Sequence, residues 1–152
     1  IVRVNADCPL IAPVEVDRII KAWHNEQPGL DYASNILEET FPMGMHIEIF
    51  SRTALNRAES NAFNLEEREH VTPYIYRNPS LFKLYSITNL ENLSHFRWTV
   101  DYQEELEFVR KVVEALEPNN QEFGMMDVVN LLNEHPELMN INSQYKKSQN
   151  LL

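Results

Sequence analysis

The amino-acid sequence alternates short apolar runs rich in β-branched residues with longer amphipathic segments, and this alternation most constrains the fold. Residues 1–5 predict a buried strand, because β-branched side chains favour pleated surfaces. Pro9 ends that strand, and Pro13 begins a predicted helix whose apolar residues fall at helical spacing. This order of strand, loop and helix predicts an α/β fold with a mostly parallel sheet.

The alternation continues along the rest of the chain. The patterns predict further extended segments over residues 31–35, 45–50, 82–87 and 96–100, and helices over residues 52–60, 65–76, 101–116 and 125–134. Ser51 is a suitable N-cap for the helix that follows it, and Pro73 predicts a kink. The last residues are polar, which is typical of a loosely ordered terminus.

Composition excludes several classes of protein. The 152 residues fit one globular domain, and 23 Asp and Glu against 13 Lys and Arg leave a net charge of −10, which argues against nucleic-acid binding. A single cysteine cannot form an intrachain disulfide, so a reducing, cytoplasmic setting is expected. No apolar run reaches the roughly 18 residues that span a bilayer, so no membrane partner is expected. Three scattered glycines cannot build a glycine-rich phosphate loop, so any such loop must lie elsewhere.

Two carboxylates follow predicted strands directly. Asp7 comes after the first strand, and Asp101 comes after the segment 96–100. Ligands of open α/β sheets bind beyond the carboxyl ends of strands, where two carboxylates suit a hard cation such as Mg²⁺. The alternative interpretation is that Asp101 caps a helix and that Asp7 is a turn residue.

Other ionisable residues leave similar alternatives. The charged run at residues 67–70 could bind a polar substrate or supply a base near neutral pH. The alternative interpretation is a solvated helix face with local ion pairs. His46 and Glu48 share one face of a predicted strand, which lines a pocket or faces water. The five histidines are widely spaced, which argues against a zinc site. Cys8 beside Asp7 is expected to be a packed thiol, since the carboxylate raises its pKa.

Five motifs stand in order along the chain: RVNADCPLI (residues 3–11), DYASN (31–35), FPMG with Glu48 (41–48), EREHVTPYIY (67–76) and RWTVD (97–101). Together they resemble bacterial cytidylyltransferases related to acylneuraminate cytidylyltransferase, in the branch of spore coat polysaccharide biosynthesis protein F. The resemblance covers nearly the whole chain, to about residue 143.

The resemblance implies a three-layer α/β/α sandwich of the nucleotide-diphospho-sugar transferase type. It implies transfer of CMP from CTP to a sugar, expected to be a sugar acid, with release of pyrophosphate, for surface or spore-coat polysaccharide. Asp7 and Asp101 would hold Mg²⁺ and Arg97 would balance phosphate charge, or pair internally. The residues expected on the substrate side are Asn35, Gly44, His46, Glu48, Arg68, Glu69 and His70. Relatives of this kind are typically homodimers.

Two departures from the family pattern qualify this expectation. His46 stands where the branch has an acidic residue, which bears on the identity of the sugar or on the activity itself. The basic, glycine-containing loop that holds CTP in the family has no counterpart here. Residues 1–143 are therefore expected to be the C-terminal portion of a longer, N-terminally truncated cytidylyltransferase, and residues 144–152 a polar tail. The alternative is a non-catalytic module that binds a sugar or nucleotide-sugar or that dimerises.

Overall fold

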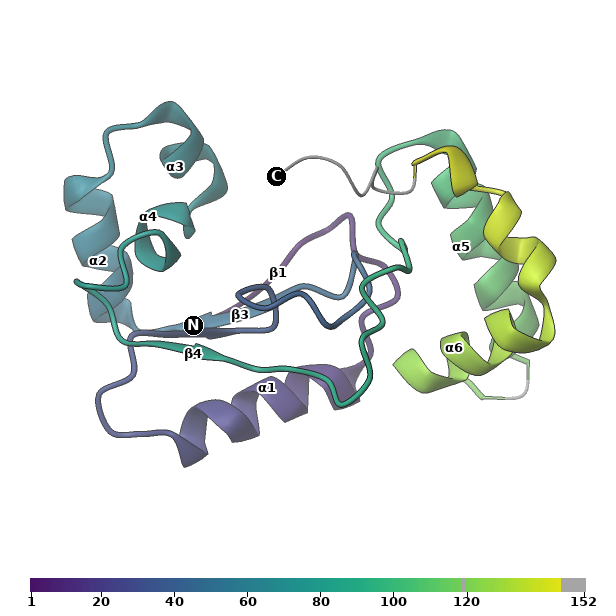
Figure 1. The fold of residues 1–152 in the computed structure, drawn as a ribbon, viewed down its shortest axis with the longest axis horizontal. Helices are drawn as coiled ribbons and strands as arrows, with labels where there is room; N and C mark the ends of the chain where they lie inside the picture. Colours follow the sequence, from purple (N-terminus) through teal and green to yellow (C-terminus); the bar gives the residue numbers. More distant parts are fainter. Residues whose placement is uncertain (119, 146–152) are drawn as a thin grey trace.

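A mixed sheet of four short strands lies at the centre of the computed structural model, which describes residues 1–118 and 120–145 (Figure 1). The strands are arranged in the order β1-β3-β2-β4. Helices lie on both faces of this sheet, and a further helical group lies beyond its end. The strand bounds are Val2–Val4 for β1, Tyr32–Ser34 for β2, Ile47–Phe50 for β3 and Leu84–Ser86 for β4.

The expectation of a mostly parallel sheet is wrong for the described residues. β3 pairs antiparallel with both β1 and β2, and only β2 and β4 are parallel neighbours. Parallel neighbours need a crossover, commonly a helix. No helix lies in the connection 35–46, so the chain turns back after β2 and places β3 between β1 and β2. Helical crossovers do separate β1 from β2 and β3 from β4.

Each face of the sheet is covered by helices from the crossovers. On one face, α1 (Pro13–Asn25) packs Ile19 against Ile47 and Ile49 of β3. On the other face, Tyr32 and Phe50 pack against α2 (Arg52–Asn61) and α4 (Pro73–Tyr76). The buried residues of this cluster are Tyr32, Phe50, Ala54, Ala58, Ile75 and Phe82. Both α1 and α2 begin where the sequence predicted.

β1 forms as predicted, but it is not buried. It is an edge strand that pairs with β3; Val2 and Val4 are 41% and 50% exposed, and Ile1, just before the strand, is 50% exposed. The residues opposite Val2 and Val4, Ile49 and Ile47, are buried because α1 packs over β3 and β2. β-Branched composition therefore predicted the strand, whereas its burial depended on where α1 lies.

The predicted helix 65–76 is two helices, α3 (Leu65–His70) and α4. The break lies at Val71, which has a φ of 70° and ψ of −52°, and the Thr72 N–H donates to the His70 carbonyl at 2.8 Å. This is a γ-turn with positive φ, which is rare and strained for a β-branched residue. Pro73 then occupies the first turn of α4.

A third core cluster joins residues 41–45 and 96–98 to α5 (Gln103–Leu116) and α6 (Met125–Glu134). The predicted strand 96–100 is extended but forms one isolated parallel bridge, Met43 with Arg97. Two short 3-10 helices follow, η1 (Pro136–Asn140) and η2 (Ser143–Tyr145), and residues 146–152 of the predicted tail lie outside the described residues. Within the described ranges, no helix is long and apolar enough to span a membrane.

Candidate functional site

The backbone of Asp7 lies against the segment that ends in Asp101, although the two residues are far apart in the sequence. The Val100 N–H donates to the Asp7 carbonyl at 2.9 Å, and the Thr99 hydroxyl donates to the same oxygen at 3.2 Å. Asp7 is half-buried and Asp101 is exposed. The tertiary fold therefore places one predicted metal ligand beside the segment that carries the other.

Asp101 is held by Arg97 and Glu105. The Arg97 guanidinium donates to Asp101 Oδ2 at 2.7 Å and also pairs with the fully buried carboxylate of Glu105. Glu105 in turn accepts from the Asp101 N–H at 2.7 Å, while Tyr102 is the N-cap of α5. Asp101 is thus not the helix cap, and Glu105 and Arg97 hold it in place. Sequence reasoning missed Glu105, whose only signal was its place in the first turn of the predicted helix.

Burial and the neighbouring charges shift two pKa values in this cluster. Burial lowers the pKa of Arg97, but hydrogen bonds and charges from Glu105 and Asp101 outweigh it, so the pKa lies above its ordinary value. Burial, with a hydrogen bond to Asp7 and the charge of that carboxylate, raises the pKa of the Cys8 thiol to about 12. The Cys8 thiol lies 3.3 Å from Asp7 Oδ1 and is a packed residue, as its surroundings in the sequence indicated.

The donor set suits magnesium better than zinc. The described residues contain no group of three or more His, Cys, Asp and Glu side chains arranged to hold a metal. Protein sites for Mg²⁺ commonly supply one or two carboxylates and leave the other positions to water and substrate phosphates. Asp7 and Asp101 fit that pattern, and each has a second carboxylate oxygen that the contacts above do not use.

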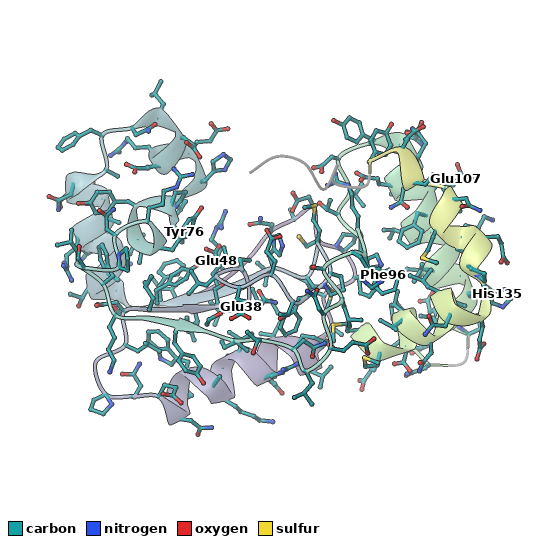
Figure 2. The ribbon with its side chains drawn as sticks, in the orientation of Figure 1. Glu38, Glu48, Tyr76, Phe96, Glu107 and His135 are labelled. Carbon is teal, nitrogen blue, oxygen red and sulfur yellow. The ribbon has the colours of Figure 1, made fainter. Side chains whose placement is uncertain are left out.

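A second polar cluster surrounds Glu48 on the α4 side of the sheet. Glu48 is 4% exposed, and its carboxylate accepts from the Tyr32 hydroxyl at 2.7 Å and the Thr72 hydroxyl at 2.6 Å. Arg3 of β1 donates to the other oxygen, and Figure 2 shows Glu48 beside Tyr76. A buried carboxylate needs such donors, since its desolvation is otherwise costly.

Three of these partners were not predicted as site residues: Arg3, Tyr32 and Thr72. Arg3 stands directly opposite Glu48 in the β1–β3 register, a relation that a sequence does not display. Thr72 reaches Glu48 because it follows the strained turn at Val71. Burial, together with the Glu48 charge, holds the pKa of Tyr32 well above its usual range. The strain at Val71 marks this turn as a functional candidate.

Three of the predicted substrate residues shape the loop 35–46. The Asn35 amide donates to the Met45 carbonyl at 2.7 Å and accepts from the Ile47 N–H at 2.9 Å, so it is buried and satisfied. Gly44 has a φ of 96° and lies against the backbone of Thr99, where a Cβ would come within 2.5 Å of nitrogen. Half-buried His46 lines a small pocket with Asn35.

Three further predicted substrate residues, Arg68, Glu69 and His70, lie exposed on α3. Arg68 donates to the Ala62 carbonyl at 3.3 Å, which ties α3 to the end of α2. A cavity of about 190 Å³ lies between these helices, and its lining residues are Leu55, Ala58, Glu59, Ala62, Glu67, Arg68 and Val71. The charged motif therefore lines this cavity through Glu67 and Arg68, and it directly precedes the turn that carries Thr72.

Comparison with known proteins relates nearly the whole chain to longer proteins. No protein-family model matches it. An uncharacterized protein of Methanocaldococcus jannaschii is 30% identical over 97% of the chain and 58% of its own length. The spore coat polysaccharide biosynthesis protein SpsF of Bacillus subtilis is 24% identical over 90% of the chain and 56% of its own length.

A solved structure shares the fold. A cytidylyltransferase from Leptospira borgpetersenii superposes with a TM-score of 0.85 at 27% identity, over 99% of this chain and 60% of that one. The chain thus spans somewhat more than half the length of the proteins that it matches.

Proposed function

Because this chain belongs to the cytidylyltransferase family, we propose that it forms part of a CTP-dependent nucleotidyltransferase that activates a sugar. The observation that carries the proposal is the match of 99% of the chain to a cytidylyltransferase at a TM-score of 0.85. The contact of Asp7 with residues 99 and 100, which directly precede Asp101, supports it, since a nucleotidyltransferase needs carboxylates near its phosphates.

In the proposed reaction, a sugar hydroxyl oxygen attacks the α-phosphorus of CTP. A new bond forms between oxygen and phosphorus, the bond to the pyrophosphate oxygen breaks, and the hydroxyl proton leaves to solvent. Asp7 and Asp101 would hold Mg²⁺, which when bound neutralises phosphate charge. Arg97 orients the Asp101 carboxylate through its ion pair. Glu105 fixes both residues, because it pairs with the Arg97 guanidinium and accepts from the Asp101 N–H. Positioning therefore dominates the contribution of this chain.

The substrate side is assigned to the Glu48 cluster and to the loops beside it. Asn35, Gly44 and His46 shape one loop, and the motif that carries Arg68, Glu69 and His70 directly precedes Thr72, which donates to Glu48. The same proposal includes a sugar acid as the acceptor and use of the product in spore-coat or other surface polysaccharide. It also includes a homodimer, a cytoplasmic location and a complete three-layer sandwich. Support for the polysaccharide role is the name of the Bacillus subtilis relative.

A second candidate function is that of a module that binds a sugar or nucleotide-sugar, or dimerises, without catalysing transfer. The internal pairing of Arg97 with Glu105 and Asp101 favours this alternative, since a paired guanidinium is less available to phosphates.

Pyrophosphate release separates the two functions. The full-length protein is assayed with CTP, Mg²⁺ and a panel of sugars and sugar acids. Asp7→Asn and Asp101→Asn are expected to lower turnover by about a hundredfold or more, and exposed Asp17→Asn on α1 serves as the matched control. Unchanged turnover in both variants would refute the metal assignment. Sugar binding without pyrophosphate release from the wild-type protein would favour the second function.

A further inference from the structure

An open apolar cavity lies in the lobe that α2, α3 and α4 form on one side of the sheet, away from α5 and α6 (Figure 1). The cavity has a volume of about 190 Å³, and Leu55, Ala58 and Ala62 form its apolar wall on the α2 side. Arg68 and Val71 line it on the α3 side and are themselves exposed, so the cavity opens to solvent.

Two large apolar side chains project from the same lobe. Phe63 directly follows Ala62 of the cavity wall, and Leu65 is the first residue of α3. Phe63 is 87% exposed and Leu65 is 84% exposed. Apolar side chains that stand singly on a surface are ordinary, but a cluster of them beside an apolar cavity marks a contact site.

We propose that this face, which consists of the cavity with Phe63 and Leu65, binds the same face of a second copy of the chain. The inference rests on the homodimer of the proposed function, for which it supplies the contact surface, but it does not depend on transfer of CMP. In a dimer with two-fold symmetry both copies use one self-complementary surface. Phe63 or Leu65 of each copy would therefore enter the cavity of the other.

The size of the cavity suits such an insertion. Apolar cavities of about 150 Å³ hold a benzene ring, so a cavity of about 190 Å³ accommodates the side chain of Phe63 or of Leu65. Interfaces between proteins commonly have an apolar centre and a polar rim. This face has the same arrangement, because charged residues stand at the mouth of the cavity.

The charges around the cavity suit a symmetric contact. Glu59, Glu67 and Arg68 all line it, and within residues 1–118 and 120–145 none of the three forms an ion pair. A two-fold axis lets Arg68 of each copy face the carboxylates of the other, which favours this register over others. The net charge of −10 on each copy opposes association, but salt largely screens exposed charges that are more than about 8 Å apart.

A second copy accounts for this face better than a small apolar ligand does. A ligand in the cavity would leave Phe63 and Leu65 exposed, whereas a symmetric partner covers the cavity and both side chains. Stable interfaces bury about 800 Å² on each partner, and α3, which has no buried residue, supplies further surface for the contact. Contact at Val71 would also brace the strained turn that carries Thr72, the donor to Glu48.

Analytical ultracentrifugation of the full-length protein tests this surface. The wild-type protein is expected to sediment as a dimer at micromolar concentration. Phe63→Asp with Leu65→Asp is expected to raise the dissociation constant of the dimer by about a hundredfold or more, because a few central anchors carry most of the binding energy of an interface. Far-UV circular dichroism should match that of the wild type, since both side chains are exposed in the folded chain.

Leu90→Asp with Met126→Asp is the matched control. Both residues are exposed apolar side chains, and both lie outside the α2–α3–α4 lobe, so this double variant is expected to keep the dissociation constant of the wild type. A monomeric wild-type protein would overturn the proposal. A dimer that persists in the Phe63 and Leu65 variant, or one that the control weakens equally, would do the same.

Intermolecular NOEs between differently labelled copies of the full-length wild-type protein locate the contact without any substitution. NOEs are expected between the Phe63 ring or the Leu65 methyl groups of one copy and the Leu55 or Val71 methyl groups of the other. A dimer that shows none of these NOEs would place its contact on another surface and refute the inference. Neither measurement uses turnover, so failure of the proposed catalytic function and failure of this inference are distinguishable.

Discussion

Replacement of Thr72 by Val tests the Glu48 cluster. Thr72 is 2% exposed, and its hydroxyl donates to the Glu48 carboxylate at 2.6 Å. It also stands at the N-cap position of α4, but its side chain makes no capping hydrogen bond, so the cost of the change can be assigned to Glu48. Valine has nearly the same shape, which keeps the packing and removes the donor.

The expected loss follows from the charge of the acceptor. A hydrogen bond to a charged group contributes about 1.5–3 kcal/mol, and Glu48 keeps its contacts with Tyr32 and Arg3. Thr72→Val should therefore lower the free energy of unfolding by about 2 kcal/mol, which corresponds to a melting temperature roughly 4–8 °C lower for a domain of this size. Urea unfolding followed by far-UV circular dichroism measures the loss, provided that the slope m is unchanged.

Two comparisons make the test specific. Exposed Thr53→Val on α2 removes the same hydroxyl where no buried partner exists, and its effect should stay within about 0.5 kcal/mol. In a Glu48→Gln background the acceptor is neutral, so the cost of Thr72→Val should fall to about 1 kcal/mol. A loss at Thr72 no larger than that at Thr53, or one unaffected by Glu48→Gln, would refute the reasoning.

Two further predictions concern the other cluster and its loop. Gly44→Ala should lower the free energy of unfolding by about 2 kcal/mol or more, since the new Cβ would lie 2.5 Å from the Thr99 backbone nitrogen. Gly29→Ala is the control, because Gly29 shares the positive φ but has open space around it. Equal losses of unfolding free energy in the two variants would contradict the clash at Gly44. With a pKa of about 12, Cys8 should react with iodoacetamide at pH 8.5 roughly a thousandfold more slowly than a free thiol. Asp7→Asn should speed that reaction by removing the carboxylate that raises the pKa, and an unchanged rate would contradict the contact between them.

Local elements of the fold followed from local patterns. The helix at Pro13, the N-cap at Ser51, which accepts from the Ala54 N–H at 2.9 Å, and the helix at residues 125–134 all form as predicted. These features depend on neighbours within a few residues, which a sequence displays directly. The antiparallel placement of β3 did not follow, because it depends on how the helix-free connection 35–46 turns back between two strands.

Some residues of the candidate site could be identified from the sequence, and others only from the structure. The sequence indicated Asp7, Asp101 and Glu48 as carboxylates of interest, and its ordered motifs indicated the family. Arg3 and Thr72, which hold Glu48, and Glu105, which holds Arg97, became visible only in the structure. Each of these three residues looks ordinary in its own segment, and its role arises from a partner elsewhere in the chain.

The sequence by itself therefore determined the order and type of most elements and the residue types that any chemistry must use. The tertiary structure alone decided the direction of β3, the exposure of the β1 edge and the burial of the Glu48 carboxylate. The physical reason is range. Helix starts, caps and turns are stabilised by contacts within one or two turns of chain, whereas strand order and the donors around a buried charge depend on segments brought together only by folding.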